Sequence, residues 1–494
     1  MIKTENEQVI VIGSGIGGLT AAALLAKHGY KILILEKNHL PGGCCSTYPR
    51  FGFTFEAGAT TLIGFDDFQP LIRLEKEVGL QLDKIHLGIP MSVWLDGIQI
   101  RKYEDLNAWI EEAEYHFGKE GQRQFWELCY QTALDAWEIS YSMPYFPPSS
   151  FGDWVRLLNP VNLRFIKSFP WIFKSTKDVL ASFGLDENKK FMRFINQQML
   201  IASQAYSDDT QFLIGAPVLT YTNSPNYYLR GGLVQLPDQL ISMIRESGNS
   251  IYYRKEVVNI HQQGKGYEVV CSDGTKYSAS KVISNSTIWD MTEMITGNKS
   301  PYFEKLAHRF KFSWGAFIIN LGIKNRFPEL DILHHQIIFD EPLPFLNSVS
   351  VFLSANHESD EDRAPAGYRA INISTHDPDP EIWFSLSPED YEKRKTVIEN
   401  AILDRLRKIL PLADDDISVK FSGTAKSFNE WIGRKHGRVG GIPSDGLKTI
   451  FRMASPRTPM KNLYMVGDTV FPGQGISAVT QSGINTFFRV ISDR

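Results

Sequence analysis

The sequence predicts an α/β fold in which a parallel sheet near the N-terminus carries a second domain inserted between its strands. Three observations predict it. Residues 9–36 match a strand, a glycine turn, a helix and a second strand. Residues 462–491 match a strand followed by a helix, and the long region between holds helices and strands of an inserted domain. A glycine turn between a strand and a helix is typical of a Rossmann-like domain that binds a dinucleotide.

The first element is an apolar strand at residues 9–12, which runs directly into a turn rich in glycine. Gly13 permits the tight turn, Gly15 lets the backbone approach a diphosphate, and Gly18 lets the following helix pack closely on the strand. The diphosphate meets the helix N-terminus, whose free N–H groups favour an anion. We therefore predict a dinucleotide site that also includes Gly17, with a purely structural turn as the alternative.

A second strand at residues 31–35 ends in Glu36. Its carboxylate can accept both hydroxyls of an adenosine ribose, and it would repel a 2′-phosphate, which disfavours NADP. Lys37 follows, and we include it among the predicted cofactor contacts. The pair Gly42-Gly43 then allows the backbone to pass close to the same ligand, which an extended flavin dinucleotide needs more than NAD does.

Length and composition bound the other possibilities. With 494 residues the chain is long enough for about two to three domains, and a net charge of −4 gives no reason to expect nucleic acid as a partner. Four cysteines without CxxC or Cys/His metal spacing predict no disulfide framework and no metal site, and they fit a reducing cytoplasm. We expect no signal peptide in residues 1–8. No apolar run reaches the about 18 residues that span a bilayer, so any membrane contact would be peripheral.

Glu36, the run Pro41-Gly42-Gly43 and the pattern Phe53-x-Phe55-Glu56-x-Gly58 resemble the start of the FAD-dependent phytoene desaturases and carotenoid cis-trans isomerases. These belong to the wider amine-oxidase-like flavoproteins. The resemblance implies a glutathione-reductase-like FAD-binding domain in which Val257 and Val258 border the adenine. Many members have arginine where this chain has Cys44, and a small residue there is closer to the isomerases. Cys44 is expected to be a small buried filler, with a redox-active thiol as the alternative.

Glu56 allows two interpretations. It can bond to the backbone of a cofactor loop, or it can be an ordinary surface acid.

A second motif lies near the C-terminus, where a strand ends in Gly467-Asp468. Asp468 is expected to accept a hydrogen bond from a ribityl hydroxyl. The helix N-terminus at Gly475, Ile476 and Ser477 would place N–H groups and the positive dipole end beside the flavin N1/O2 locus, where a reduced flavin carries negative charge. The run from 471 to 476 resembles the isomerases more closely than the desaturases. Both motifs together predict a tightly but non-covalently held FAD.

The middle of the chain is predicted to be helical at residues 103–140, and a run of prolines then introduces a different composition. Residues 151–177 interleave basic with aromatic and aliphatic side chains, which suits a helical segment lying in the lipid interface. The alternative is a solvated basic helix whose aromatic side chains face the core. The side chains in question are Phe151, Trp154, Arg156, Leu157, Leu158, Arg164, Phe165, Ile166, Lys167, Phe169, Trp171, Phe173, Lys174 and Lys177.

Further strands are predicted at residues 314–323, 335–339, 348–353 and 369–374, with a helix at 388–409. We divide the chain into a discontinuous FAD-binding domain, residues 1–90, 226–299 and 451–494, and an α+β substrate and membrane-contact domain, residues 91–225 and 300–450.

The predicted function is that of an FAD-dependent oxidoreductase or isomerase acting on a long apolar polyene, a carotenoid or its precursor. Cis-trans isomerisation is favoured, and desaturation is the alternative. A flavin amine oxidase is a second alternative, although residues 431–441 are basic and glycine-rich where amine oxidases usually present an aromatic cage. A non-catalytic polyene carrier is a third. No catalytic acid or base is identified, since the cofactor can carry the chemistry. The protein is expected to be cytoplasmic and peripherally membrane-associated, and its oligomeric state stays open.

Overall fold

The N-terminal glycine turn lies at the centre of a five-stranded parallel sheet in the computed structural model of the chain, which describes residues 8–296, 300–310, 313–444 and 446–493. The strand order is β20-β13-β1-β2-β9. The bounds are β1 (Gln8–Ile12), β2 (Lys31–Leu35), β9 (Ser250–Tyr252), β13 (Lys281–Ser284) and β20 (Leu463–Met465). The sequence β1, α1, β2 is the one predicted. Residues 1–7, where no signal peptide is expected, lie outside the described residues.

Both faces of this sheet are covered, so its central strand is buried from Val9 to Ile12, as parallel sheets usually are. Val9 and Val11 belong to the cluster that includes α1 (Ile16–Lys27), α9 (Gln235–Glu246) and α16 (Ile476–Ser492). Ile10 and Ile12 point to the other face. There they meet α10 (Ile288–Met294), α11 (Pro301–Arg309) and a small sheet of β10 (Val257–Gln263), β11 (Gly266–Cys271), β12 (Lys276–Ala279) and β14 (Ile295–Thr296).

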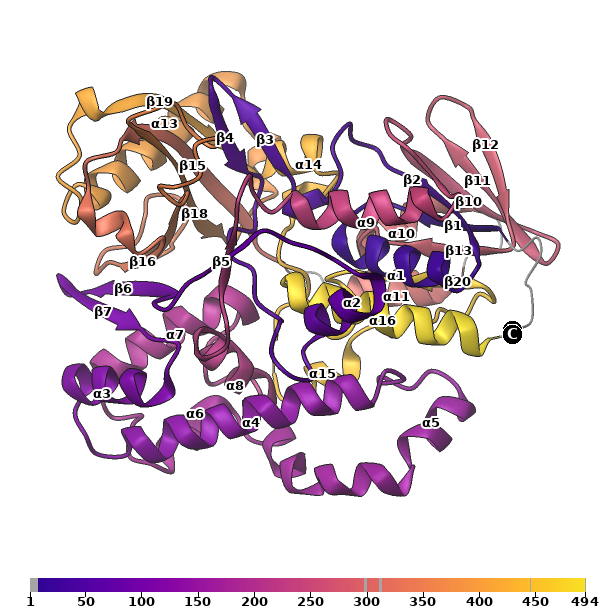
Figure 1. Ribbon diagram of the computed structural model, residues 1–494, viewed down its shortest axis with the longest axis horizontal. Coiled ribbons are helices and arrows are strands. Elements are labelled where there is room, and N and C mark those ends of the chain that lie inside the picture. Colours follow the sequence, from indigo (N-terminus) through magenta and orange to yellow (C-terminus); the bar gives the residue numbers. More distant parts are fainter. Residues whose placement is uncertain (1–7, 297–299, 311–312, 445, 494) are drawn as a thin grey trace.

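The second large unit is a seven-stranded mixed sheet of order β19-β15-β18-β17-β16-β6-β7, seen at the upper left of Figure 1. Its strands are β6 (Met91–Leu95), β7 (Ile98–Lys102), β15 (Gly315–Lys324), β16 (His334–Ile338), β17 (Ser350–Ala355), β18 (Tyr368–Asp377) and β19 (Ile417–Gly423). The buried residues of helix α13 (Pro388–Leu406) pack into the hydrophobic core formed by strands of this sheet. The four predicted strands and the helix are therefore present, with ends that differ by a few residues.

A layer of helices lies below this sheet in Figure 1. It contains α3 (Leu106–Phe117), α4 (Gln122–Ser142), α6 (Thr176–Ala181), α7 (Lys189–Ser203) and α8 (Phe212–Thr220), which share a core with β6 and β7. Residues 151–177 extend from it as α5 (Phe151–Leu157) and the 3₁₀ helix η2 (Pro160–Ile172). In the part of the chain that is described, no helix is both long and apolar enough to cross a bilayer.

Two short antiparallel ribbons join the units: β3 (Thr47–Arg50) with β4 (Phe53–Glu56), and β5 (Lys84–His86) with β8 (Tyr227–Leu229). Every strand of the parallel sheet falls in the three segments assigned to the FAD-binding domain, and every strand of the seven-stranded sheet falls in the segments assigned to the inserted domain. The domain division itself stays a prediction.

Candidate functional site

One large cavity of about 1700 Å³ lies where the two units meet. Its lining includes nearly every residue predicted to contact the cofactor: Gly13, Gly15, Gly17, Glu36, Lys37, Gly42, Gly43, Val257, Val258, Gly467, Asp468, Gly475, Ile476 and Ser477. Of the residues predicted to contact the cofactor, Gly18 alone does not line the cavity. The structure thus brings together residues from both ends and the middle of the chain, and their binding roles stay predictions.

The first glycine turn is packed too tightly for side chains. A Cβ on Gly18 would lie 2.7 Å from the carbonyl oxygen of Gly13 and 3.3 Å from Val11 Cγ1, which agrees with its predicted role in helix packing. A Cβ on Gly15 would overlap the amide of Asn285, which follows β13 and lines the cavity. The glycines at the start of α1 thus carry no side chains of their own that could cover its backbone N–H groups, and the Asn285 amide lies beside them.

Glu36 ends β2 with its carboxylate held by the backbone. Its Oε2 accepts hydrogen bonds from Ser14 N at 2.7 Å and from Ser14 Oγ at 2.6 Å, and its Oε1 accepts from Asn38 N at 2.7 Å. Oε1 keeps a further lone pair for a ribose hydroxyl, whereas Oε2 already accepts two hydrogen bonds. The next residue, Lys37, forms an ion pair with Glu256 at 2.8 Å beside the cavity-lining residues Val257 and Val258.

The second glycine turn lies directly against the first. Gly42 has φ 95° and bridges to Gly15, while its N–H donates to the carbonyl of Ser14 at 2.9 Å. Cys44 lines the cavity beyond this turn, and its removal from water raises the pKa of the thiol, an effect that Asp468 reinforces and Arg434 opposes. A raised pKa keeps the sulfur protonated, which favours the small filler over the redox-active thiol.

The C-terminal motif forms the opposite wall. Gly467 has φ 112°, and helix α16 begins at Ile476 after Gly475, with no side chain capping its N-terminus. The positive end of this 17-residue helix therefore lines the cavity. Asp468 does not stand free: its two carboxylate oxygens accept hydrogen bonds from Arg434 at 3.1 and 2.7 Å.

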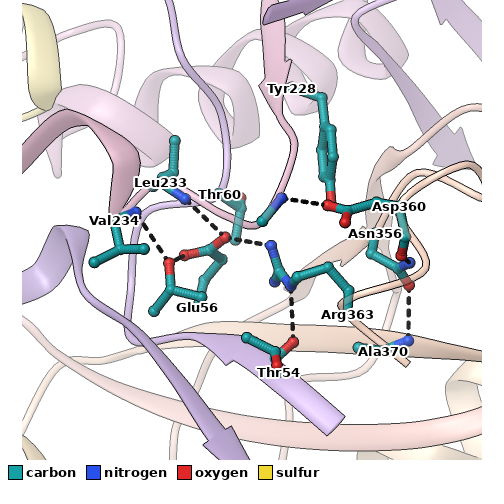
Figure 2. Close-up of polar contacts among 12 residues, drawn as sticks. Thr54, Glu56, Thr60, Tyr228, Leu233, Val234, Asn356, Asp360, Arg363 and Ala370 are labelled. Carbon is teal, nitrogen blue, oxygen red and sulfur yellow. Dashed lines mark hydrogen bonds and ion pairs between the residues drawn. The ribbon is translucent and has the colours of Figure 1, made fainter. Parts of the chain in front are cut away.

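Glu56 is neither a surface acid nor a partner of the first glycine turn, so the surface interpretation is wrong. Its carboxylate is 7% exposed and pairs with Arg363 at 2.7 Å, while Thr47 Oγ1 and the N–H of Leu233 also donate to it. Figure 2 shows how this pair lies between β4, the segment after β8 and the loop before β18. The same strand continues into Gly58, Ala59, Thr60 and Thr61, which line the cavity.

Away from the two motifs the cavity is lined mainly by apolar side chains. One part of the lining is formed by α7, α8 and β17, with residues such as Ile201, Leu213 and Phe352, and another by α4, α5 and η2. Within residues 151–177 the aromatic side chains divide. Phe165 is buried and Trp171 is half-buried against Phe212, so for these two the core-facing alternative holds. Phe151, Trp154, Phe169 and Phe173 are exposed.

Sequence reasoning assigned no role to Asn285 and left that of Arg434 open. Asn285 stands one residue beyond β13, at the carboxyl edge of the parallel sheet where ligands usually bind, so its position alone was a usable signal. Arg434 belongs to a basic region whose charges, by sequence alone, could face the cofactor, lipid or water. No local pattern relates it to Asp468, which is 34 residues away.

Comparisons with known proteins agree with this geometry. A family model described as flavin containing amine oxidoreductase matches residues 16–486. Prolycopene isomerase 2 of an Oncidium hybrid cultivar is 30% identical over 99% of this chain and 85% of its own. The 4,4′-diapolycopene oxygenase of Methylomonas sp is 26% identical over 100% of both chains. The crystal structure of cyclohexylamine oxidase from Brevibacterium oxydans has the same fold, with a TM-score of 0.62 at 15% identity over 98% of this chain and 100% of that one.

The cavity also fits the cofactor that this family uses. FAD needs a ribose acceptor, a side-chain-free approach for its diphosphate and a second clamp for its ribityl and flavin half. Glu36, the two glycine turns and the wall formed by Asp468 and α16 provide these along one continuous surface. FAD is therefore the cofactor, and the chain is a member of the flavin containing amine oxidoreductase family.

Proposed function

We propose that this protein is an FAD-dependent enzyme that acts on a long apolar polyene, a carotenoid or its precursor, and that it is a cis-trans isomerase. The observation that carries the proposal is that the residues predicted to contact FAD and a large set of apolar side chains line the same cavity. A volume of about 1700 Å³ exceeds the roughly 300–1000 Å³ of ordinary ligand sites, so it leaves room for an extended substrate beside the cofactor. The names of the relatives, prolycopene isomerase and diapolycopene oxygenase, support the same substrate class.

The residues of the chain position the substrate, exclude water from it and determine the local charge. FAD, when bound, supplies the electron or hydride chemistry. Helix α16 directs its uncapped N-terminus at the cavity and so favours negative charge there. The apolar walls exclude water from the substrate. His376 also lines the cavity. Burial lowers the pKa of its imidazole to about 4, so the ring is neutral at pH 7 and places no positive charge beside an apolar chain.

The helix dipole helps an isomerase and a desaturase alike, so the reaction must be separated by experiment. The purified protein is offered a poly-cis carotenoid and, separately, phytoene, each with chemically reduced flavin without air and with oxidised flavin plus a quinone. We expect a product of unchanged mass from the poly-cis compound with reduced flavin only. Loss of hydrogen from phytoene with oxidised flavin, without any reaction of the poly-cis compound, would make the enzyme a desaturase.

Amine oxidation is the weaker candidate. Arg434 and Lys435 line the cavity and already pair with Asp468 and Glu293, so these acids are not available to a cationic amine. Peroxide release from putrescine or cyclohexylamine that exceeds polyene turnover would reverse this order. A non-catalytic carrier is ruled out by any turnover in the experiment above.

We also propose that residues 151–173 rest on a membrane and admit the substrate from it. Phe151 is 84% exposed, Leu158 77% and Ile166 69%, and Trp154, Phe169 and Phe173 in the same segment are exposed as well. Leu157, Leu158, Leu163 and Ile166 also line the cavity, which connects the surface to the FAD wall. Three of the basic residues pair with acids, Arg156 with Asp153, Arg164 with Glu138 and Lys167 with Asp135, so binding should rest more on apolar contact than on charge.

The test is flotation with liposomes. A variant with Phe151, Leu158, Ile166 and Phe169 changed to Ser should lose binding and retain its fold, because these side chains are exposed. The matched control changes Phe51 and Phe345, exposed on other faces of the chain, to Ser and should float like the parent. Only a modest loss is expected in high salt. Equal flotation of the four-residue variant and the parent would refute the proposed membrane contact.

A further inference from the structure

Arg434 is a buried cation in the wall of the cavity. Its side chain is 12% exposed, and it lines the cavity together with Cys44 and Asp468. Burial disfavours its charge, but the carboxylate of Asp468 outweighs this and raises the pKa of Arg434 above its ordinary value. Cys44 lies close enough for the guanidinium to oppose the rise that burial causes in the pKa of its thiol. The guanidinium is thus permanently charged and stands next to the second glycine turn.

The guanidinium is not fully used by the protein. Its Nη1 and Nη2 donate to Asp468, and its Nε donates to the carbonyl of Arg438 at 2.9 Å. An arginine carries five N–H donors, so two remain for a ligand in the cavity. A guanidinium with two free N–H groups and a fixed orientation suits phosphate oxygens.

The ligand that needs such a group is the diphosphate of FAD, which carries negative charge into a partly buried site. The two glycine turns, residues 13–18 and 40–46, contain no Lys or Arg. Three other cations line the cavity, but each is held by an acid: Lys37 by Glu256, Lys255 by Asp273 and Lys435 by Glu293. Their acids are between 43% and 68% exposed, which places these pairs at the rim. Among the cationic side chains in the described lining, Arg434 is the one that lies deep in the cavity wall and not at the rim.

The segment that carries Arg434 follows the cofactor wall. At one end the carbonyl of Trp431 accepts a hydrogen bond from Asn38, and a Cβ on Gly433 would lie 3.5 Å from Lys37. At the other end Gly441 lies against the backbone of Asp468 so closely that a Cβ would overlap it. The guanidinium therefore stands between the adenosine end of the site, marked by residues 36–38, and the ribityl end, marked by Asp468.

We propose that Arg434 is a cofactor-binding residue that neutralises the diphosphate of FAD, and that residues 431–441 form a strap that holds it there. The glycine turns provide the shape and the N–H groups for the diphosphate, and the strap provides the countercharge from a distant part of the chain.

The test compares ligands that contain different parts of FAD. Apoprotein of the parent, Arg434→Gln and the control Lys420→Gln is titrated with FAD, with ADP, which has the diphosphate but no flavin, and with riboflavin, which has the flavin and ribityl but no phosphate. Arg434→Gln should bind FAD and ADP about tenfold to a hundredfold more weakly and riboflavin within about threefold of the parent. Lys420 is exposed on β19 and does not line the cavity, so Lys420→Gln should bind all three like the parent.

Two further measurements distinguish a loss of binding from misfolding of the variants. Circular dichroism and thermal melting of the apoproteins establish that the variants fold. The double variant Cys44→Arg/Arg434→Gln returns a guanidinium to the same space and should recover at least part of the lost affinity for FAD and ADP. If Arg434→Gln loses riboflavin and keeps ADP, Arg434 only positions Asp468 for the ribityl chain, and the proposal is overturned. Unchanged FAD binding in Arg434→Gln would overturn it as well.

Discussion

Replacing Arg363 with methionine would leave the carboxylate of Glu56 buried without its counter-ion. The two side chains are 3% and 7% exposed and lie 2.7 Å apart, and Arg363 Nε also donates to the carbonyl of Thr54 at 2.9 Å. Around the pair, Asp360 accepts hydrogen bonds from Tyr228 at 2.6 Å and from the N–H of Gly231 at 2.7 Å. The pair thus joins segments far apart in the sequence (Figure 2).

The expected loss is large because the remaining charge cannot reach water. Removing one partner of a buried ion pair costs about 3–5 kcal/mol, whereas replacing both with neutral groups costs much less. An unfolding entropy of about 2.1 cal/mol/K per residue gives about 1 kcal/mol/K for 494 residues, so Arg363→Met should lower Tm by roughly 3–5 °C. The double variant Glu56→Gln/Arg363→Met should be more stable than Arg363→Met alone, since a neutral amide replaces the stranded carboxylate.

The assay is thermal and urea unfolding of the apoprotein, which separates stability from cofactor binding. Glu56→Gln, Arg363→Met and the double variant complete a double-mutant cycle with the parent. Additive losses, or an Arg363→Met variant that melts within about 1 °C of the parent, would refute the claim that the pair is coupled and buried.

Three further predictions concern the cofactor wall and the buried groups beside it. Glu36→Ala should weaken FAD binding by about 1.5–3 kcal/mol, roughly one to two decades, and Asp468→Ala should do likewise; titration of apoprotein that shows parental affinity in both would mean that the ribose and ribityl partners are wrong. Gly18→Ala should destabilise α1 because its Cβ would lie 2.7 Å from the Gly13 carbonyl, whereas Gly88→Ala, where a Cβ meets nothing within 4 Å, should melt like the parent. His376→Gln should reduce the loss of stability in acid. Burial lowers the pKa of His376 to about 4, so the unfolded chain binds a proton at this residue at a higher pH than the folded chain does. The parent should therefore lose about 3 kcal/mol of its free energy of unfolding through this residue as the pH falls from about 6.5 to 4. Urea midpoints of parent and variant that fall in parallel from pH 7.5 to 4.5 would show that His376 is not held neutral.

Much of this protein could be predicted from the sequence because the relevant interactions are local. The strand, turn and helix from Gln8 to Lys27 are encoded by apolar runs and by glycines whose positive φ or tight packing excludes other residues. Glu36 lies one residue beyond β2 and Asp468 three residues beyond β20, at strand ends that the pattern marks. Fourteen of the fifteen predicted contact residues consequently line one cavity.

Residues 151–173 show where pattern reasoning stops. Composition alone indicates that aromatic and basic residues share the segment, but η2 is a 3₁₀ helix in which Phe165 faces inward while Phe169, four residues later, is exposed. Which of the two rings faces the core depends on α4 and α8, against which η2 packs.

The remaining features were decided by tertiary structure alone. Glu56 meets Arg363 across 307 positions, and Arg434 reaches Asp468 from a strap that no secondary-structure pattern predicts. Each residue by itself is compatible with a solvated surface, because a charge is stable in water. Burial makes a partner obligatory, since an isolated charge inside the protein costs several kcal/mol, and only the packed chain determines which opposite charge lies within reach.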